Sequence, residues 1–216
     1  MATREVVIIG TGGLGRETLW AFQGRTDVAV RGFLTDDSSQ HDTRVCGLPV
    51  LGAENWVIGR PELEAVCAIG DPRARRAMVS SLGAQGVRFA SAIHPSVLRS
   101  EFVELGVGCI AGARAVLTSQ VCVADHVVIG AAAILSHDSV LEDFATLAPG
   151  VLLAGGVRVG YGAELGAHAT VIPACSVGRG ALVGAGAAVV ADIAPNVVAA
   201  GVPARVFREL PESERL

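Results

Sequence analysis

A glycine-rich turn near the N-terminus is the first feature of this sequence whose residue types and spacing suggest a chemistry. Gly10, Gly12 and Gly15 have the spacing GxGxxG, and they stand between an apolar run, Val6–Ile9, and a helix-like stretch from Arg16 to Phe22. In this context the glycines allow a tight turn, and the amide groups at the start of the helix can bind a phosphate. The motif predicts a nucleotide site, and the alternative is a plain structural turn.

Acidic residues follow the glycines at a distance that fits the same site. The next predicted strand, Val28–Leu34, ends at Thr35, Asp36 and Asp37. An acidic residue about twenty positions after such glycines commonly binds a ribose hydroxyl.

The remaining elements of this region complete one mononucleotide-binding half. We predict a third strand over Ala65–Ile69, a helix over Pro72–Leu82 and a last strand over Val87–Ile93. A dinucleotide dehydrogenase needs two such halves in about 150 residues, together with a substrate domain. Only the first 95 residues are available before the pattern of the sequence changes, so a mononucleotide site is favoured.

The second part of the chain is a repeat with a period of six residues. Its spacing fits neither the 3.6-residue period of a helix nor the period of two of a strand. Glycine often follows the repeated aliphatic residue, and three hexapeptides make one coil of 18 residues. Such coils stack at roughly 4.8 Å, the spacing of neighbouring strands, so the repeat predicts a parallel β-helix. The repeated positions, all aliphatic, are Leu105, Ala111, Leu117, Val123, Ile129, Leu135, Leu141, Leu147, Leu153, Val159, Leu165, Val171, Val177, Val183 and Val189.

Composition excludes several classes of protein. The 216 residues are 51% hydrophobic and 4% aromatic, which suits a narrow β-helix interior lined by aliphatic side chains. The longest uncharged stretches have 14 residues and are too short for a membrane span, and the N-terminus predicts no signal peptide. The net charge is -4 without a basic stripe, so no nucleic acid is expected as a partner. The densest basic group, Arg73, Arg75 and Arg76, is predicted to be a solvated helix face.

Cysteine usage indicates a cytoplasmic protein. The five cysteines are odd in number and lack CxxC or CxxH spacing, so we expect reduced, mostly buried thiols and no structural zinc site. They are Cys46, Cys67, Cys109, Cys122 and Cys175.

The two parts together resemble the hexapeptide-repeat sugar O- and N-acyltransferases of the sialic-acid-acetylating, bacillosamine-acetylating and perosamine-acetylating type. The resemblance covers essentially the whole chain. It implies a Rossmann-like, nucleotide-sugar-binding half domain over residues 1–95. A left-handed parallel β-helix with a short C-terminal tail would follow over residues 96–216. It also implies a homotrimer, acetyl-CoA as cosubstrate in the groove between neighbouring subunits, and no metal. The segments that carry it are VVIIGTGGLGRE, GFLTDD, AIGDPRARR, AIHPSV, ILSHDSVLEDFATLAPGVLLAGGVRVG and VVAAGVPARV.

The resemblance assigns roles to single residues. The family's catalytic histidine matches His137 and the acidic residue after it matches Asp138. An imidazole can accept a proton near neutral pH, and a carboxylate beside it would orient the ring. Gly155 lies 18 residues after His137, so it should stack about 5 Å away and offer its amide to the acetyl carbonyl. The other acetyl-CoA positions match Thr146, Ala167 and Ala185. Sugar-nucleotide positions match Gly12, Gly13, Leu14, Thr35, Asp36 and Gly70.

Two positions depart from many amino-sugar members of the family, which carry histidine where this chain has Leu14 and Thr146. The resemblance implies transfer of an acetyl group to the amino group of a nucleotide-activated sugar, and the alternative is O-acetylation of a sialic acid or related glycan. A scaffold that only binds nucleotide sugar is the non-enzymatic alternative.

A β-helical carbonic anhydrase would need three zinc-binding histidines. The spacings of His126, His137 and His168, 11 and 31 residues, do not match that family's pattern. His126 and His168 are instead predicted to be solvated or interface residues on the outer edges of the β-helix, and His94 to make a turn contact.

Overall fold

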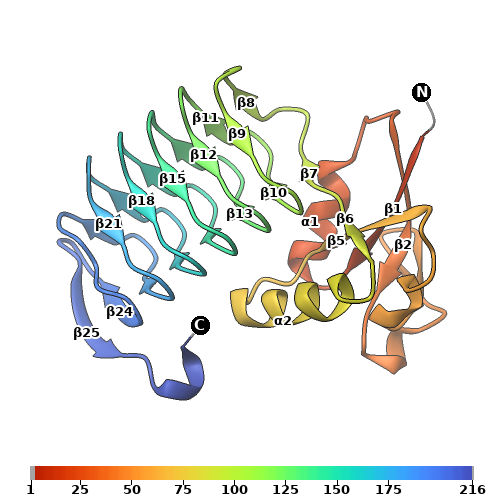
Figure 1. Cartoon of the computed structure of the whole chain (residues 1–216). Coiled ribbons are helices and arrows are strands. Elements are labelled where there is room, and N and C mark those ends of the chain that lie inside the picture. Colours follow the sequence, from red (N-terminus) through yellow and green to blue (C-terminus); the bar gives the residue numbers. More distant parts are fainter. Residues whose placement is uncertain (1–2, 216) are drawn as a thin grey trace. The chain divides into compact units, whose positions relative to one another are not determined.

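The N-terminal unit is built on a sheet with the strand order β3-β4-β2-β1-β5-β6. The computed structural model describes residues 3–215, and Figure 1 displays its elements. The strands of this sheet are β1 (Arg4–Ile9), β2 (Val28–Leu34), β3 (Arg44–Val45), β4 (Leu48–Gly52), β5 (Leu63–Cys67) and β6 (Arg88–Phe89). The helices of the unit are α1 (Gly13–Ala21), α2 (Pro72–Gly83) and the short 3-10 helices η1 (Ser38–Gln40) and η2 (Glu54–Val57).

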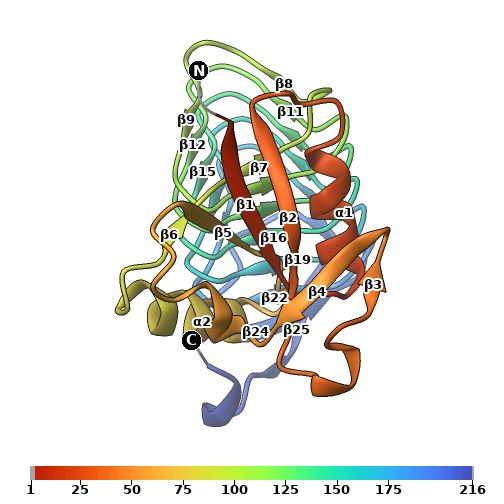
Figure 2. The same cartoon turned by 90° about the vertical axis from the view of Figure 1, so that its right-hand side faces the viewer.

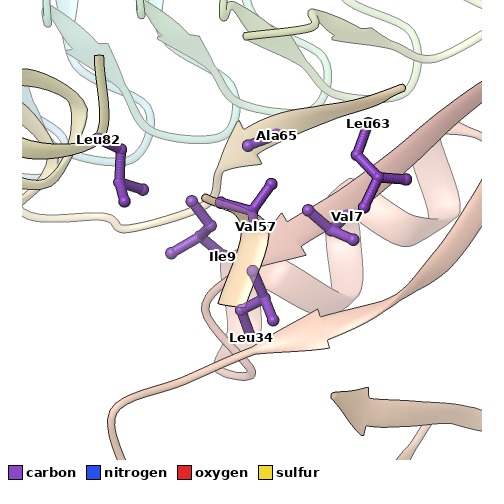
Figure 3. Packing of buried hydrophobic residues seen from close by; sticks show 7 residues of the cluster. All are labelled: Val7, Ile9, Leu34, Val57, Leu63, Ala65 and Leu82. Atoms are coloured by element: carbon purple, nitrogen blue, oxygen red, sulfur yellow. The ribbon is translucent and has the colours of Figure 1, made fainter. Parts of the chain in front are cut away.

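Strand β1 lies at the centre of this sheet. It pairs in parallel with β2 on one side and with β5 on the other. Because both faces of β1 are covered, Val6, Val7, Ile8 and Ile9 are all fully buried, as their continuous apolar run predicts. One cluster of the core on this sheet is drawn in Figure 3; its members are Val7, Ile9, Leu34, Val57, Leu63, Ala65 and Leu82.

Three boundaries differ from the predicted elements. Helix α1 begins at Gly13 rather than Arg16, and β5 is shifted two residues toward the N-terminus of its predicted range. The predicted single strand Val87–Ile93 is wrong, because the chain changes partners within it. The Ala90 amide donates to Ala65 at 2.9 Å, whereas the Ala92 amide donates to Cys109 at 2.8 Å. The second half, β7 (Ala92–Ile93), therefore belongs to a different sheet.

The rest of the chain forms the predicted left-handed parallel β-helix. Its strands have two residues each, apart from the last two, which are longer and pair antiparallel with each other. An eight-stranded sheet contains β7, β10 (Ile110–Ala111), β13 (Val128–Ile129), β16 (Thr146–Leu147), β19 (Glu164–Leu165), β22 (Leu182–Val183), β24 (Val197–Ala200) and β25 (Arg205–Glu209). A six-stranded sheet contains β8 (Leu98–Arg99), β11 (Val116–Leu117), β14 (Ile134–Leu135), β17 (Leu152–Leu153), β20 (Thr170–Val171) and β23 (Ala188–Val189). A five-stranded sheet contains β9 (Glu104–Leu105), β12 (Cys122–Val123), β15 (Val140–Leu141), β18 (Arg158–Val159) and β21 (Ser176–Val177). The tail after β25 contains η3 (Glu212–Glu214).

The register of the β-helix follows the 18-residue coil. Ile134 pairs with Leu152 and Leu135 pairs with Leu153, and this offset recurs through the coils. In these two strands the second residue points inward, so Leu135 and Leu153 are fully buried. Figure 2 views the coils along their stacking direction. Residues 18 apart therefore form columns along the three edges where one sheet passes into the next.

The chain divides into two units. One holds the described residues up to Pro95 together with Val107–Ile110, and the other holds Ser96–Gly106 and the described chain from Ala111 onward.

All five cysteines are free thiols, and Cys67, Cys109 and Cys175 are buried. Burial raises the pKa of the Cys67 thiol to about 12. Within residues 3–215, no helix is long and apolar enough to cross a membrane.

Candidate active site on the β-helix

His137 and Asp138 form a hydrogen-bonded pair on the edge between β14 and β15, which we call the His137 edge. The imidazole Nδ1 lies 2.7 Å from Asp138 Oδ2, and the two side chains are 67% and 57% exposed. An ionised carboxylate can only accept a hydrogen bond. Nδ1 therefore carries a hydrogen atom and donates the hydrogen bond to Asp138 Oδ2. In the neutral ring, Nε2 is then left with its lone pair and can accept a proton.

The backbone at Asp138 fixes the direction of its carboxylate. Asp138 adopts a left-handed conformation with φ of 61°, which aspartate tolerates better than most residues. Its amide donates to the carbonyl of Ser119, one coil earlier, at 3.1 Å. The carboxylate is thus held beside the imidazole by a stacked, hydrogen-bonded turn rather than by a flexible loop.

Gly155 lies directly against the ring of His137, as its position one coil later predicts. A Cβ atom at position 155 would be 2.5 Å from His137 Nε2 and 3.1 Å from Nδ1, so a side chain there would displace the imidazole. The Gly156 amide donates to the His137 carbonyl at 2.8 Å, which ties the two coils together at this point. A side chain at 155 is therefore incompatible with the observed position of the ring.

The Gly155 amide is free for a ligand. The Gly155 carbonyl accepts a hydrogen bond from the Ala174 amide at 3.0 Å, but the Gly155 amide donates none to any of residues 3–215. A free backbone amide next to an imidazole is the arrangement that can stabilise an oxyanion while a proton is removed. The structure thus brings His137, Asp138 and Gly155 together.

The other three predicted acetyl-CoA positions lie away from His137 in the same chain. Thr146 is in β16, and Ala167 and Ala185 are at the edge that follows the eight-stranded sheet, which we call the Ala167 edge. Ala167 and Ala185 stack one coil apart, and the Gly186 amide donates to the Ala167 carbonyl at 2.8 Å. Ala185 is exposed and Ala167 is half-buried. The six-stranded β-helix sheet separates this edge from His137 within one chain.

Two other histidines occupy the two remaining edges. His168 is exposed at the Ala167 edge, as predicted. The prediction for His126 is wrong, because its side chain is buried against Phe144, the residue one coil later, with the rings stacked at 5.3 Å and 11°. The three histidines of the carbonic anhydrase alternative therefore point from three different edges. Among the described residues, no group of three histidine, cysteine, aspartate or glutamate side chains is arranged to hold a metal ion.

Candidate nucleotide site in the N-terminal unit

The glycines of the GxGxxG turn have different structural roles. Gly10 has φ of 106°, and a Cβ atom there would lie 2.8 Å from the Ala68 carbonyl oxygen. Gly15, in the first turn of α1, packs against the Gly10 carbonyl so closely that no side chain fits. Gly12 and Gly13 face open space and are exposed. Two glycines therefore shape the turn, and two leave its surface accessible to a ligand.

Thr35, Asp36 and Gly70 lie at the same edge of the sheet as this turn, because β1, β2 and β5 are parallel neighbours that all end there. Thr35 is buried, and its carbonyl accepts a hydrogen bond from His41 Nε2 at 2.8 Å. The Asp36 amide donates to Glu54 Oε1 at 2.8 Å, while its own carboxylate is exposed. Leu14 is half-buried in the first turn of α1. The structure thus gathers the six predicted sugar-nucleotide positions at one edge.

The prediction of a solvated helix face is wrong for Arg75. Its side chain is fully buried, and Nη1 donates to the Ile69 carbonyl at 2.7 Å and the Gly70 carbonyl at 2.8 Å. Nothing in the spacing of the three arginines distinguishes Arg75 from its neighbours. The Asp71 carboxylate begins α2 by accepting from the amides of Arg73 and Ala74.

Comparison with known proteins supports both units. Residues 5–82 match the protein family described as the PglD N-terminal domain. No curated protein matches the chain. Among solved structures, the acetyltransferase domain of PglB from Neisseria gonorrhoeae FA1090, in complex with acetyl coenzyme A, is similar with a TM-score of 0.89 and 30% identity. The match covers 95% of this chain and 100% of that one.

Two further structures extend this similarity. A histidine-to-asparagine mutant of perosamine N-acetyltransferase from Caulobacter crescentus, in complex with CoA and GDP-perosamine, has a TM-score of 0.88 and 33% identity, over 95% of this chain and 97% of that one. WeeI from Acinetobacter baumannii AYE has a TM-score of 0.82 and 25% identity, over 94% of this chain and 99% of that one.

Proposed function

Because the chain belongs to the hexapeptide-repeat sugar acyltransferase family, we propose that it transfers the acetyl group of acetyl-CoA to the amino group of a nucleotide-activated sugar, with His137 as the general base. The observation that carries this proposal is the His137–Asp138 pair at 2.7 Å, with the imidazole against Gly155. The related perosamine N-acetyltransferase, captured with CoA and a nucleotide-linked amino sugar, supports the choice of acceptor.

The residues of the pair divide the proton transfer between them. Nε2 of His137 takes a proton from the acceptor amine as the amine nitrogen bonds to the acetyl carbon. Asp138 holds the ring through Nδ1 and stabilises the imidazolium that forms. When the carbon–sulfur bond breaks, the imidazolium returns the proton to the departing sulfur, so that free CoA and the N-acetyl sugar are released. No covalent acetyl-enzyme is needed for this direct attack.

Gly155 has two functions in this scheme. Its missing side chain leaves room for the His137 ring, and its amide donates a hydrogen bond to none of residues 3–215. We propose that this amide stabilises the negative charge that develops on the acetyl oxygen. A backbone donor is suited to this task because the stacked coil fixes it before the substrate arrives.

We further propose that the enzyme works as a homotrimer in which acetyl-CoA bridges two copies. The small side chains of Ala167 and Ala185 line a different edge from His137, so one chain alone presents the two halves of the site apart. The six-stranded β-helix sheet between those edges turns aliphatic side chains outward, and two of them, Leu98 and Ile134, are 66% and 38% exposed. Burial of this sheet against neighbouring copies would set one copy's His137 edge beside another's Ala167 edge.

Within the N-terminal unit we propose that Gly12, Gly13, Leu14, Thr35, Asp36 and Gly70 hold the nucleotide of the acceptor. The open surface at Gly12 and Gly13 and the exposed carboxylate of Asp36 support this assignment. The five free cysteines fit a cytoplasmic location.

Release of CoA from acetyl-CoA over a panel of nucleotide amino sugars and sialic acids tests the proposal. We expect turnover with a nucleotide amino sugar and its loss in His137→Asn. Turnover with sialic acids alone would establish the O-acetyltransferase alternative. No release of CoA with any acceptor would favour a scaffold that only binds nucleotide sugar, and full activity of the variant would contradict the assignment of the base.

A further inference from the structure

Arg75 is a buried cation at the ligand-facing edge of the N-terminal sheet. It is 0% exposed, and one nitrogen of its guanidinium, Nη1, donates to two successive carbonyls, those of Ile69 and Gly70. Burying a guanidinium is unfavourable unless hydrogen bonds compensate for the lost water. The buried guanidinium therefore indicates that the conformation of the loop after β5 depends on the hydrogen bonds from Arg75.

The two hydrogen bonds determine which way the loop presents its amides. Both peptide bonds are trans, since the single cis peptide among residues 3–215 is Val202–Pro203. In a trans peptide the N–H points opposite to the C=O. With the carbonyls of Ile69 and Gly70 turned inward to Arg75, the amides of Gly70 and Asp71 point away from it. Neither amide donates a hydrogen bond within the described chain.

This loop lies beside the glycine turn. The Ala68 amide donates to the Ile9 carbonyl at 2.8 Å, and only glycine at position 10 allows the Ala68 carbonyl to approach so closely. At the other end of the loop, Asp71 Oδ1 accepts from the Ala74 amide at 3.0 Å. The loop is therefore fixed at both ends, and Arg75 sets the orientation of the peptides between them.

We propose that Arg75 is a positioning residue for the nucleotide sugar. It orients the amides of Gly70 and Asp71 toward the ligand, where they act with the open surface at Gly12 and Gly13. Two free amides with the positive charge of Arg75 behind them favour an anionic ligand group. In a nucleotide sugar the anionic group is the diphosphate. The side chain itself does not touch the substrate. This inference rests on the proposed function.

Replacement of Arg75 by methionine, with Arg76→Met as the matched control on the exposed face of the same helix, tests the inference. Binding is measured by calorimetry with GDP, UDP and CoA as probes, and the kinetic constants with the acceptor found in the panel. In Arg75→Met we expect the affinity for the better-bound nucleotide to fall tenfold or more. The KM of the acceptor should rise in parallel, while kcat and the affinity for CoA stay within twofold. Arg76→Met should change none of these.

A structural role alone would lower the active fraction and hence kcat, without a selective change in KM. A folded Arg75→Met with unchanged nucleotide affinity would overturn the inference. If Arg75→Met does not fold, Arg75→Gln keeps a polar but uncharged side chain that is too short to reach both carbonyls, and unchanged nucleotide affinity in that variant would overturn the inference equally. A wild-type protein that binds neither GDP nor UDP would contradict the proposed nucleotide site together with this inference.

Discussion

His137 and His168 lie at two edges of one β-helix, both are exposed, and each imidazole packs against a glycine in a neighbouring coil. The ring of His137 covers Gly155, and a Cβ atom at Gly150 would lie 2.6 Å from His168 Nδ1. The difference is in the backbone. At the first edge the left-handed position is taken by Asp138, with φ of 61°, whereas at the second it is taken by His168 itself, with φ of 57°.

The position of each histidine relative to the left-handed residue decides whether an acid can lie beside its ring. The residue after a left-handed corner position points into the β-helix, so Ala169, which follows His168, is fully buried and could not carry a carboxylate into solvent. A histidine one position earlier is followed by an exposed corner residue, and Asp138 there holds Nδ1 at 2.7 Å. At this corner two adjacent positions are exposed, and His137 and Asp138 occupy them.

The largest expected effect separates the two histidines directly. His137→Asn removes the proposed base, and we expect kcat to fall by about 10²–10⁴, the usual contribution of a general base. His168→Asn should keep kcat within about twofold at saturating acetyl-CoA, because no carboxylate of residues 3–215 orients that ring. Release of CoA from both purified variants measures this, and an equal loss in both would remove the distinction drawn from the backbone.

The next effect concerns the glycine under the catalytic ring. In Gly155→Ala the new methyl group occupies the place of the imidazole, and the exposed ring can swing outward to avoid it. Misplacement of a reacting group by about 1 Å can cost on the order of 10² in rate. We therefore expect a similar fall in kcat with little change in stability, since φ at Gly155 is not positive. An active Gly155→Ala would show that the ring does not need its observed position.

A smaller effect is expected from Asp138→Asn, since both members of the pair are more than half exposed. The amide of asparagine can donate to Nδ1, which would move the ring proton to Nε2 and remove the accepting lone pair. A buried carboxylate in a comparable role contributes about 10⁴, so for this exposed pair we expect roughly 10- to 10²-fold in kcat. Asparagine is tolerated at positive φ, so the variant should fold normally, which circular dichroism can check. Unchanged kcat would mean that Asp138 does not orient the ring.

The sequence predicts the β-helical part of this site because the repeat fixes its geometry. Once the 18-residue coil is recognised, the positions of Leu135 in the interior and of Gly155 against His137 follow from counting. The burial of Arg75 and His126 does not follow in this way. Arg75 is one of three similar arginines on a helix whose buried face is set by tertiary packing, and His126 is covered by the ring of Phe144. The split of residues 87–93 between two sheets likewise depends on partners distant in sequence.

The smallest effect completes the comparison at the second edge. Gly150 has φ of 72°, so Gly150→Ala places a Cβ atom in a left-handed conformation as well as against the exposed, movable ring of His168. The left-handed conformation costs a non-glycine residue about 1–2 kcal/mol. We expect the free energy of unfolding in urea to fall by roughly that amount, with kcat unchanged. The two glycines should then be needed for different properties of the enzyme. Gly155 is needed for catalysis more than for stability, and Gly150 for stability more than for catalysis. If Gly150→Ala loses activity while remaining stable, the His168 edge contributes to the reaction, and the functional difference between the two histidines would have to be sought in the ligand rather than in the backbone.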